Sequence, residues 1–211
     1  MLLILQDKHG SKSFYDSFLL SKQFNSKYQD KWENELNLIN FNWEACNSNV
    51  FANTIDRYLQ WIQYRVVHRI LGTNELLFKI KIKDTPTCTF CKTVNESIKH
   101  LFFECDIVFP ILQALEQWIN STSNDQINFE KTCILLGMFG EKNKAINTII
   151  LLYKRFIYEM KMKEQIPHFR ILKMKIIQYI KIEKMISRKN NKLSEFEKKW
   201  ENLINLLNED A

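Results

Sequence analysis

Glycine and proline are scarce in this sequence, with four Gly and three Pro among 211 residues. Sandwiches and barrels of many short strands need turn residues about every 8–12 positions, so this scarcity argues against such folds. Long apolar runs are also missing. None approaches the roughly 18 residues of a membrane span, and the apolar opening 1–5 is shorter than the roughly 7–15 residues of a secretory signal core. We therefore expect a mainly α-helical chain that is soluble and intracellular, in the nucleus or cytoplasm, not secreted and without a membrane partner.

The abundant residues predict a packed core and a basic surface. Apolar residues make up 45% and aromatic residues 13% of the chain, which excludes wholesale disorder. The formal charge is +6, and the segment 141–192 alone carries fourteen Lys/Arg against four Asp/Glu, a net +10. The basic character therefore belongs to the C-terminal part of the chain, and it is compatible with a polyanionic partner.

Apolar residues recur at helical spacing in several segments. The first long one runs from Val50 to Leu71, with apolar residues at steps of three and four: Ile55, Leu59, Ile62, Val66 and Ile70. Gly72 is expected to stop this helix, and Thr73 to cap a shorter one. Further helices are expected near 107–119, 142–163, 169–188 and 194–207. We divide the chain into a partly helical N-terminal extension (1–49), a basic helix with a cysteine segment (50–120) and a basic helical C-terminal region (121–211).

Four residues in the middle of the chain have the spacing of a metal site. Cys88, Cys91, His100 and Cys105 follow the pattern C-x2-C-x8-H-x4-C. Two cysteines separated by two residues form a tight turn that presents both thiolates on one side, and His100 with Cys105 can complete a tetrahedron. We expect one structural Zn²⁺ here, because four protein ligands leave no position open for a reacting water.

Two other interpretations of this cluster stay open. One is accidental clustering of three cysteines and a histidine in sequence. The other is a redox C-x-x-C pair, which would need a strand–helix setting that the pattern does not indicate. Three carboxylates crowd the motif and could accept a hydrogen bond from the His100 ring, or could simply lie exposed: Glu96, Glu104 and Asp106.

The motif and the helix before it resemble a known family. Residues 59–71 (LQWIQYRVVHRIL) run into 73–77, then into CTFC at 88–91 and ESIKHLFFEC at 96–105. This is similar to the zinc-binding segment C-terminal to the reverse transcriptase in LINE-type (non-LTR) retrotransposon polyproteins. In that family a basic Q-x-K/R-x-x-x-R helix precedes C-x-x-C, and E-x-x-x-H-x-F/W-x-x-C completes a CCHC site. The likeness covers about 32–119 and, more loosely, the rest; it departs at 109–112, where the family usually has a Trp.

The resemblance implies a non-catalytic role. The polymerase of that family needs an aromatic-x-Asp-Asp signature, and this chain has no Asp-Asp pair. No endonuclease motif, nucleophile elbow or phosphate-binding glycine loop is present either. We therefore expect no enzyme activity from this chain, and a place within a larger reverse transcriptase polyprotein. There it would help to hold template RNA or target DNA during target-primed reverse transcription.

A second face of the 50–71 helix is basic and aromatic. Arg57, Trp61, Arg65 and His68 recur at helical spacing, with Arg69 alongside. Arg and Lys beside an exposed aromatic residue suit phosphate contact and base stacking. The candidate nucleic-acid contacts also include five lysines before and within the zinc segment: Lys79, Lys81, Lys83, Lys92 and Lys99. The alternative is a solvated basic face with the Trp packed into the core.

These observations predict a mainly α fold, an irregular helical domain organised around a small CCHC zinc knuckle and followed by a basic helical C-terminal bundle. We expect it to bind RNA or DNA, with an added RNA contact along 173–188 beside Tyr179. The alternatives are a zinc-ordered protein–protein interaction module and a decayed retroelement fragment with no present function. An exposed basic face at 57, 65 and 69 favours nucleic acid, whereas exposed apolar residues there favour docking.

Overall fold

The computed structural model describes residues 27–123 and 126–203, and the chain forms two compact units, Met1–Phe41 and Asn42–Ala211. The first unit contributes helix α2 (Lys27–Leu36), and the second contains the other described elements. The boundaries expected at 49/50 and 120/121 lie inside α3 (Trp43–Ala52) and α6 (Phe109–Thr122). Both helices therefore run across the expected boundaries.

The second unit is built from helices. Besides α3 and α6 it contains, in order along the chain, α4 (Arg57–Val67), α5 (Asn74–Lys79), η2 (His100–Glu104), α7 (Lys131–Leu136), η3 (Glu141–Asn143), α8 (Lys144–Met162), α9 (Phe169–Lys189) and α10 (Leu193–Trp200). Across 27–123 and 126–203, the single β feature is an isolated antiparallel bridge between Thr87 and Asn95. The predicted mainly α fold class is confirmed.

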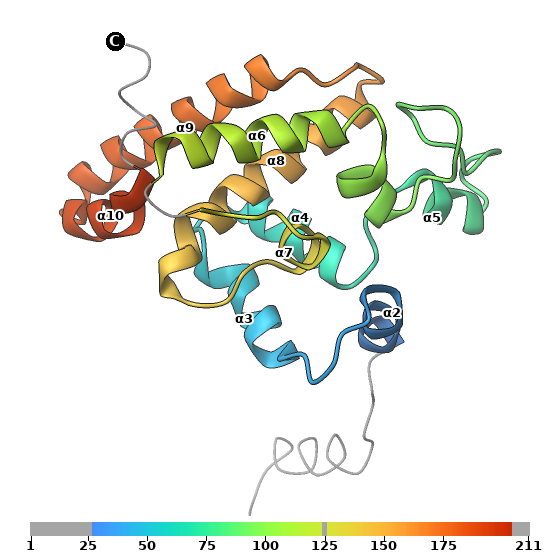
Figure 1. The fold of residues 1–211 in the computed structure, drawn as a ribbon, viewed down its shortest axis with the longest axis horizontal. Coiled ribbons are helices and arrows are strands. Elements are labelled where there is room, and N and C mark those ends of the chain that lie inside the picture. Colours follow the sequence, from blue (N-terminus) through green and yellow to red (C-terminus); the bar gives the residue numbers. More distant parts are fainter. Residues whose placement is uncertain (1–26, 124–125, 204–211) are drawn as a thin grey trace, which may run out of the picture. The chain divides into compact units, whose positions relative to one another are not determined.

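Helix α8 is the centre of the second unit. Its residues are buried on every side, which is the pattern of a core helix. It packs against α4, α9, α10 and η2, and α6 lies along α9 (Figure 1). Because η2 carries His100 and α4 carries the predicted basic face, α8 supports both candidate sites.

The helix expected over Val50–Leu71 is in fact two helices. Between them, Asp56 caps α4 by accepting hydrogen bonds from two amides of its first turn. The Thr54 hydroxyl lies 2.9 Å from the hydroxyl of Tyr179 on α9, so a contact with a distant helix fixes the break. Ile55 lies in the break with 83% of its surface exposed, so its predicted place on the apolar face of a continuous helix is wrong.

Helix α4 also ends earlier than expected. Its last residue is Val67, five residues before the expected stop at Gly72, and Arg69 adopts the left-handed conformation (φ 59°) just after the helix. Gly72 instead permits a close approach, since a Cβ there would lie 3.1 Å from the hydroxyl of Tyr158. Thr73 caps α5 as predicted, its side chain accepting a hydrogen bond from a first-turn amide at 3.4 Å.

The remaining predicted helices are largely confirmed. Those expected near 107–119, 142–163 and 169–188 correspond to α6, α8 and α9. The helix expected over 194–207 begins as α10, and its last four residues, like most of the N-terminal extension 1–49, lie outside the described residues. In the described part of the chain, no helix combines the length and apolar character needed to cross a membrane.

Candidate metal centre and nucleic-acid interface

Cys88 and Cys91 lie in a tight hairpin next to the Thr87–Asn95 bridge. The Cys88 amide donates to the carbonyl of Val94 at 2.8 Å, and its carbonyl accepts from the amide of Lys92 at 3.2 Å. Lys92 takes the left-handed conformation (φ 59°) at the tip of the hairpin. This turn places both sulfur atoms on the same side, as the C-x-x-C spacing predicted.

The other two motif residues frame η2. His100 begins this π-helical turn and Cys105 follows it, with the Cys105 amide donating to the His100 carbonyl at 2.9 Å. The His100 amide donates to the Ser97 hydroxyl at 3.0 Å. From α8, the buried hydroxyl of Tyr153 donates to the carbonyl of Phe102 at 2.8 Å. The π-helical turn is thereby fixed to the central helix.

The four side chains converge on one point. One ligand atom from each lies within 4.8 Å of the others. The Cys88 and Cys105 sulfurs are 3.9 Å apart, and the Cys91 sulfur is 3.4 Å from His100 Nε2. A tetrahedral Zn²⁺ with ordinary bond lengths would place two sulfurs about 3.8 Å apart and a sulfur and a nitrogen about 3.6 Å apart. The donor set and its spacing therefore fit zinc, which would stabilise the segment by cross-linking the hairpin to η2.

The protons of the cluster are distributed unevenly. A hydrogen bond to Cys105, together with burial, raises the pKa of Cys88 to about 12, and the same bond lowers the pKa of Cys105. Hydrogen bonding to Cys88 raises the pKa of His100 to about 8. Burial opposes ionisation of Cys91, but hydrogen bonds from Thr93 leave its pKa lowered. Binding a metal would displace these shared protons, because the ligands are thiolates and a neutral imidazole.

Glu96 joins the hairpin to the rest of the fold. It is fully buried, and its carboxylate accepts from the amide of Thr89 at 2.8 Å and from that of Asn74 at 2.9 Å. One of its oxygens also lies 3.3 Å from the ammonium of Lys161 on α8. A single carboxylate thus holds the hairpin, the start of α5 and the central helix together.

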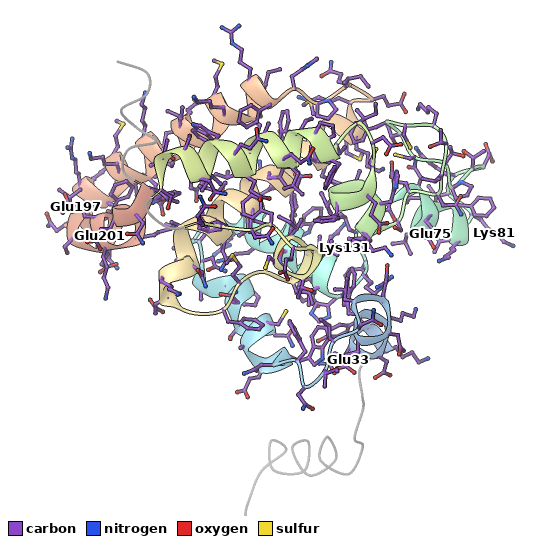
Figure 2. The ribbon with its side chains drawn as sticks, in the orientation of Figure 1. Glu33, Glu75, Lys81, Lys131, Glu197 and Glu201 are labelled. Atoms are coloured by element: carbon purple, nitrogen blue, oxygen red, sulfur yellow. The ribbon has the colours of Figure 1, made fainter. Side chains whose placement is uncertain are left out.

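The carboxylates near the motif do not play the role considered from the sequence. Glu96 serves the two amides and the lysine described above. Glu104 pairs with Lys131 of α7 at 2.9 Å and with Lys99 at 3.4 Å (Lys131 is labelled in Figure 2), and Asp106 is exposed. Nothing in the sequence marked Lys161 as the partner of Glu96, since 65 residues separate them.

The redox interpretation lacks its structural setting. The C-x-x-C pair lies in a hairpin turn, and no strand precedes a helix at this point in the described residues. The interpretation as accidental clustering is disfavoured by the convergence of all four ligand atoms.

The basic face of α4 is exposed and more aromatic than predicted. Its opposite side is buried through Leu59, Ile62 and Val66. Trp61 is 38% exposed, so it is not packed into the core. The exposed face consists of the predicted Arg57, Trp61, Arg65 and His68 together with Tyr58 and Tyr64, which the sequence reasoning missed although they fall on the same helical face.

The rings and guanidinium groups of this face form a stacked column. The Arg65 guanidinium lies 3.7 Å from the Trp61 ring centroid, and the Trp61 and Tyr58 rings stack at 5.7 Å with an interplanar angle of 25°. Arg155 of α8 lies 4.6 Å over the Tyr58 ring. Beside the column, the Tyr64 and His68 rings lie 4.2 Å apart. We call the group Arg155–Tyr58–Trp61–Arg65 the α4 column.

The other predicted contacts are on different elements. Lys79, Lys81 and Lys83 are exposed on α5 and the turn after it, where Figure 2 shows Lys81 at the outer edge, and Lys92 is exposed at the tip of the hairpin. Lys79 pairs with Glu75 at 2.5 Å, and Lys99 pairs with Glu104. These carboxylates partly neutralise the two lysines that could otherwise contact a phosphate. Arg69 lies just beyond the end of α4. The predicted contact residues are therefore grouped together only on α4, and the predicted lysines lie apart from one another on α5, the turn after it and the segment 88–105.

The C-terminal lysine-rich stretch gives less support to an added contact. Tyr179 is half-buried and its hydroxyl contacts Thr54, so the ring is not a free stacking surface. Burial raises the pKa of this hydroxyl to about 12.

Comparison with known proteins agrees with the geometry of the metal centre. A family profile described as zinc-binding in reverse transcriptase matches residues 11–111, just under half of the chain. Among curated proteins no match was found. Over residues 11–111, which contain the whole Cys/His cluster and the α4 column except Arg155, the chain is similar to the zinc-binding region of reverse transcriptases.

Proposed function

We propose that this chain binds RNA or DNA without catalysing a reaction, as the zinc-ordered region of a protein related to reverse transcriptases. The observation that carries the proposal is the outer face of α4, on which the four exposed positions are aromatic or cationic: Arg57, Tyr58, Trp61 and Tyr64. Arg side chains contact phosphates and aromatic rings stack on bases, so this composition suits a nucleic acid better than an apolar protein partner.

The metal centre has a supporting role in this proposal. One zinc at Cys88, Cys91, His100 and Cys105 would fix the hairpin and η2 against α8, the helix that also supports α4. The resemblance to LINE-type elements suggests the setting: the chain would hold template RNA or target DNA while the remainder of a reverse transcriptase polyprotein carries out the chemistry.

The test is the salt-dependent affinity of a charge-reduced variant. Arg57→Ala/Arg65→Ala should weaken binding to two unrelated RNA and DNA oligonucleotides about tenfold, and flatten the salt slope by about one to two. Fluorescence anisotropy between about 50 and 200 mM salt measures both quantities. Lys142→Ala/Lys163→Ala, which removes the same charge from exposed sites elsewhere, is the matched control. Equal losses in the two variants, or no loss in the first, would refute the assignment of the α4 face.

One observation favours the protein–protein alternative. Phe78, Ile80 and Ile82, on α5 and the turn after it, are 46%, 54% and 68% exposed. Ile80→Ser/Ile82→Ser separates the two functions, because it removes this apolar surface and leaves the α4 face intact. If that variant lost nucleic-acid binding while Arg57→Ala/Arg65→Ala kept it, the binding surface would lie on α5.

A further inference from the structure

The geometry points to a single-stranded nucleic acid with unpaired bases as the ligand of the α4 column, with a base replacing Arg65 on the face of Trp61. This inference rests on the proposed function and specifies its substrate class. It depends on the order and spacing of four planar groups and on the different anchoring of the two arginines at the ends of the column.

The two ends of the column differ in how they are held. Arg155 is fixed by carboxylates, with Asp56 at 3.5 Å and Glu159 at 2.8 Å. Arg65 has no carboxylate partner among the described residues, and its guanidinium rests on the Trp61 ring. Moving Arg155 therefore breaks two ion pairs, whereas Arg65 can move without breaking one.

The spacing within the column determines where a base can enter. Successive bases in a strand are separated by about 3.4 Å, so a base inserted between two rings needs about 7 Å. The Tyr58 and Trp61 centroids are only 5.7 Å apart, which excludes insertion between them. The Tyr58 ring is also in contact with the guanidinium of Arg155 at 4.6 Å, which two carboxylates hold in place. Of the two rings, Trp61 therefore has the more easily displaced neighbour, the guanidinium of Arg65.

Replacing the Arg65 guanidinium by a base on the Trp61 ring is favourable for the ring and for the guanidinium. An exposed cation–π contact is weak, whereas stacking of a base on an aromatic ring is stronger. The displaced guanidinium gains a phosphate of the same strand, and such charge-assisted pairs are often bidentate. Arg65 thus protects the ring in the free chain and binds the backbone in the complex.

Stacking of a base on Trp61 favours single strands over duplexes. In a duplex the base faces are already stacked on their neighbours, and only phosphates and groove edges are available to the α4 column. A strand with unpaired bases can satisfy both Trp61 and Arg65. Duplex binding would use the arginines alone, so loss of the Trp61 ring should affect single strands selectively.

The experiment compares Trp61→Ala with Phe78→Ala in the zinc-loaded full chain. Phe78 is a similarly exposed aromatic residue on α5, which makes its variant a matched control. The probes are labelled RNA and DNA 20-mers without self-pairing, and the duplexes formed with their complements, at one salt concentration. Circular dichroism checks the fold, and Trp61→Phe should restore most of the affinity because it restores a ring.

We expect Trp61→Ala to lose about tenfold in affinity for both single-stranded probes and less than twofold for the duplexes, with Phe78→Ala unchanged. Selective loss for the RNA strand or for the DNA strand would support stacking and identify which of the two is preferred. Equal losses for single strands and duplexes would overturn the stacking inference while leaving nucleic-acid binding in place. Failure of the unmodified chain to bind any probe would refute the proposed function itself, and the inference with it.

Discussion

Helix α8 buries two lysines, two turns apart, in contrasting surroundings. Lys161 faces Glu96, a buried carboxylate that also accepts from the Thr89 amide in the C-x-x-C hairpin. Lys154 faces only neutral acceptors, the side-chain oxygen of Gln63 on α4 and the carbonyl of Leu135 at 3.1 Å. Both ammonium groups are almost completely removed from water.

The two lysines differ in whether a carboxylate compensates for the burial of the ammonium group. Burial lowers the pKa of Lys161, and Glu96 opposes that shift by stabilising the ammonium. No carboxylate opposes burial at Lys154, whose pKa falls to about 7. The hairpin is therefore joined to α8 through a charged pair, and α4 is joined to α8 through a lysine whose pKa lies near neutral pH.

The largest expected effect comes from removing a metal ligand. Cys88→Ala should unfold the hairpin and η2, because a closed four-ligand site does not survive the loss of one ligand. Hydrogen exchange of the amides in 86–105 should become fast, while α8 and α9 stay protected. Cys133→Ala, at a half-buried cysteine outside the cluster, is the control. Unchanged exchange and melting in the Cys88 variant would contradict a structural metal.

The next effect tests the charged pair. Glu96→Gln should lower the free energy of unfolding by about 3 kcal/mol, because it leaves the Lys161 ammonium buried without a counter-charge. Denaturant titration of the zinc-loaded chain measures this. Glu104→Gln is the control, because it also replaces a carboxylate by an amide but in a partly exposed pair with Lys131. It should lower the free energy of unfolding by less than about 1 kcal/mol. Comparable losses at the two sites would mean that Glu96 is not the hub of the segment.

The third prediction concerns pH. Lys154 has a folded-state pKa of about 7, below the ordinary value of 10.5 that applies in the unfolded chain. Between these values the unfolded state binds the extra proton, so the free energy of unfolding rises with pH, by at most about 1.4 kcal/mol per unit. Lys154→Met should lack this rise, and the stability of the unmodified chain relative to the variant should increase from pH 7 to 10. Parallel stability curves would show that Lys154 keeps its proton.

The smallest expected effect comes from removing a single hydrogen bond made by α8. Tyr153→Phe removes the bond from its hydroxyl to the carbonyl of Phe102 and should cost about 1 kcal/mol. Metal content should not change, because the four ligands are untouched. A loss of metal in this variant would show that α8 contributes more to the site than this one contact.

The sequence predicted the metal centre because its geometry is local. The four ligands fall within eighteen residues, and a tight C-x-x-C turn constrains the sulfurs without help from distant helices. The helix face carrying Trp61 was predictable for the same reason, since side chains three and four residues apart share a side. Tyr58 and Tyr64 lie on that face too and could have been found from the same periodicity.

The features that the sequence did not predict depend on long-range contacts. The break after α3 is held by Asn53 and Thr54, which bond to Asn147, Thr148 and Tyr179 on α8 and α9. Asp56, an N-cap residue type, is a local signal for the start of α4, but the apolar periodicity runs through the break and hid it. The pairing of Glu96 with Lys161 and the addition of Arg155 to the α4 column likewise arise only when distant elements pack together.

The convergence of Cys88, Cys91, His100 and Cys105 predicts that these four residues hold one structural zinc. Elemental mass spectrometry of the purified, freshly reduced chain, with Cys88→Ser as control, tests it most directly. We expect one zinc per chain in the unmodified protein and none in the variant. A chain that is folded, reduced and free of zinc would contradict it.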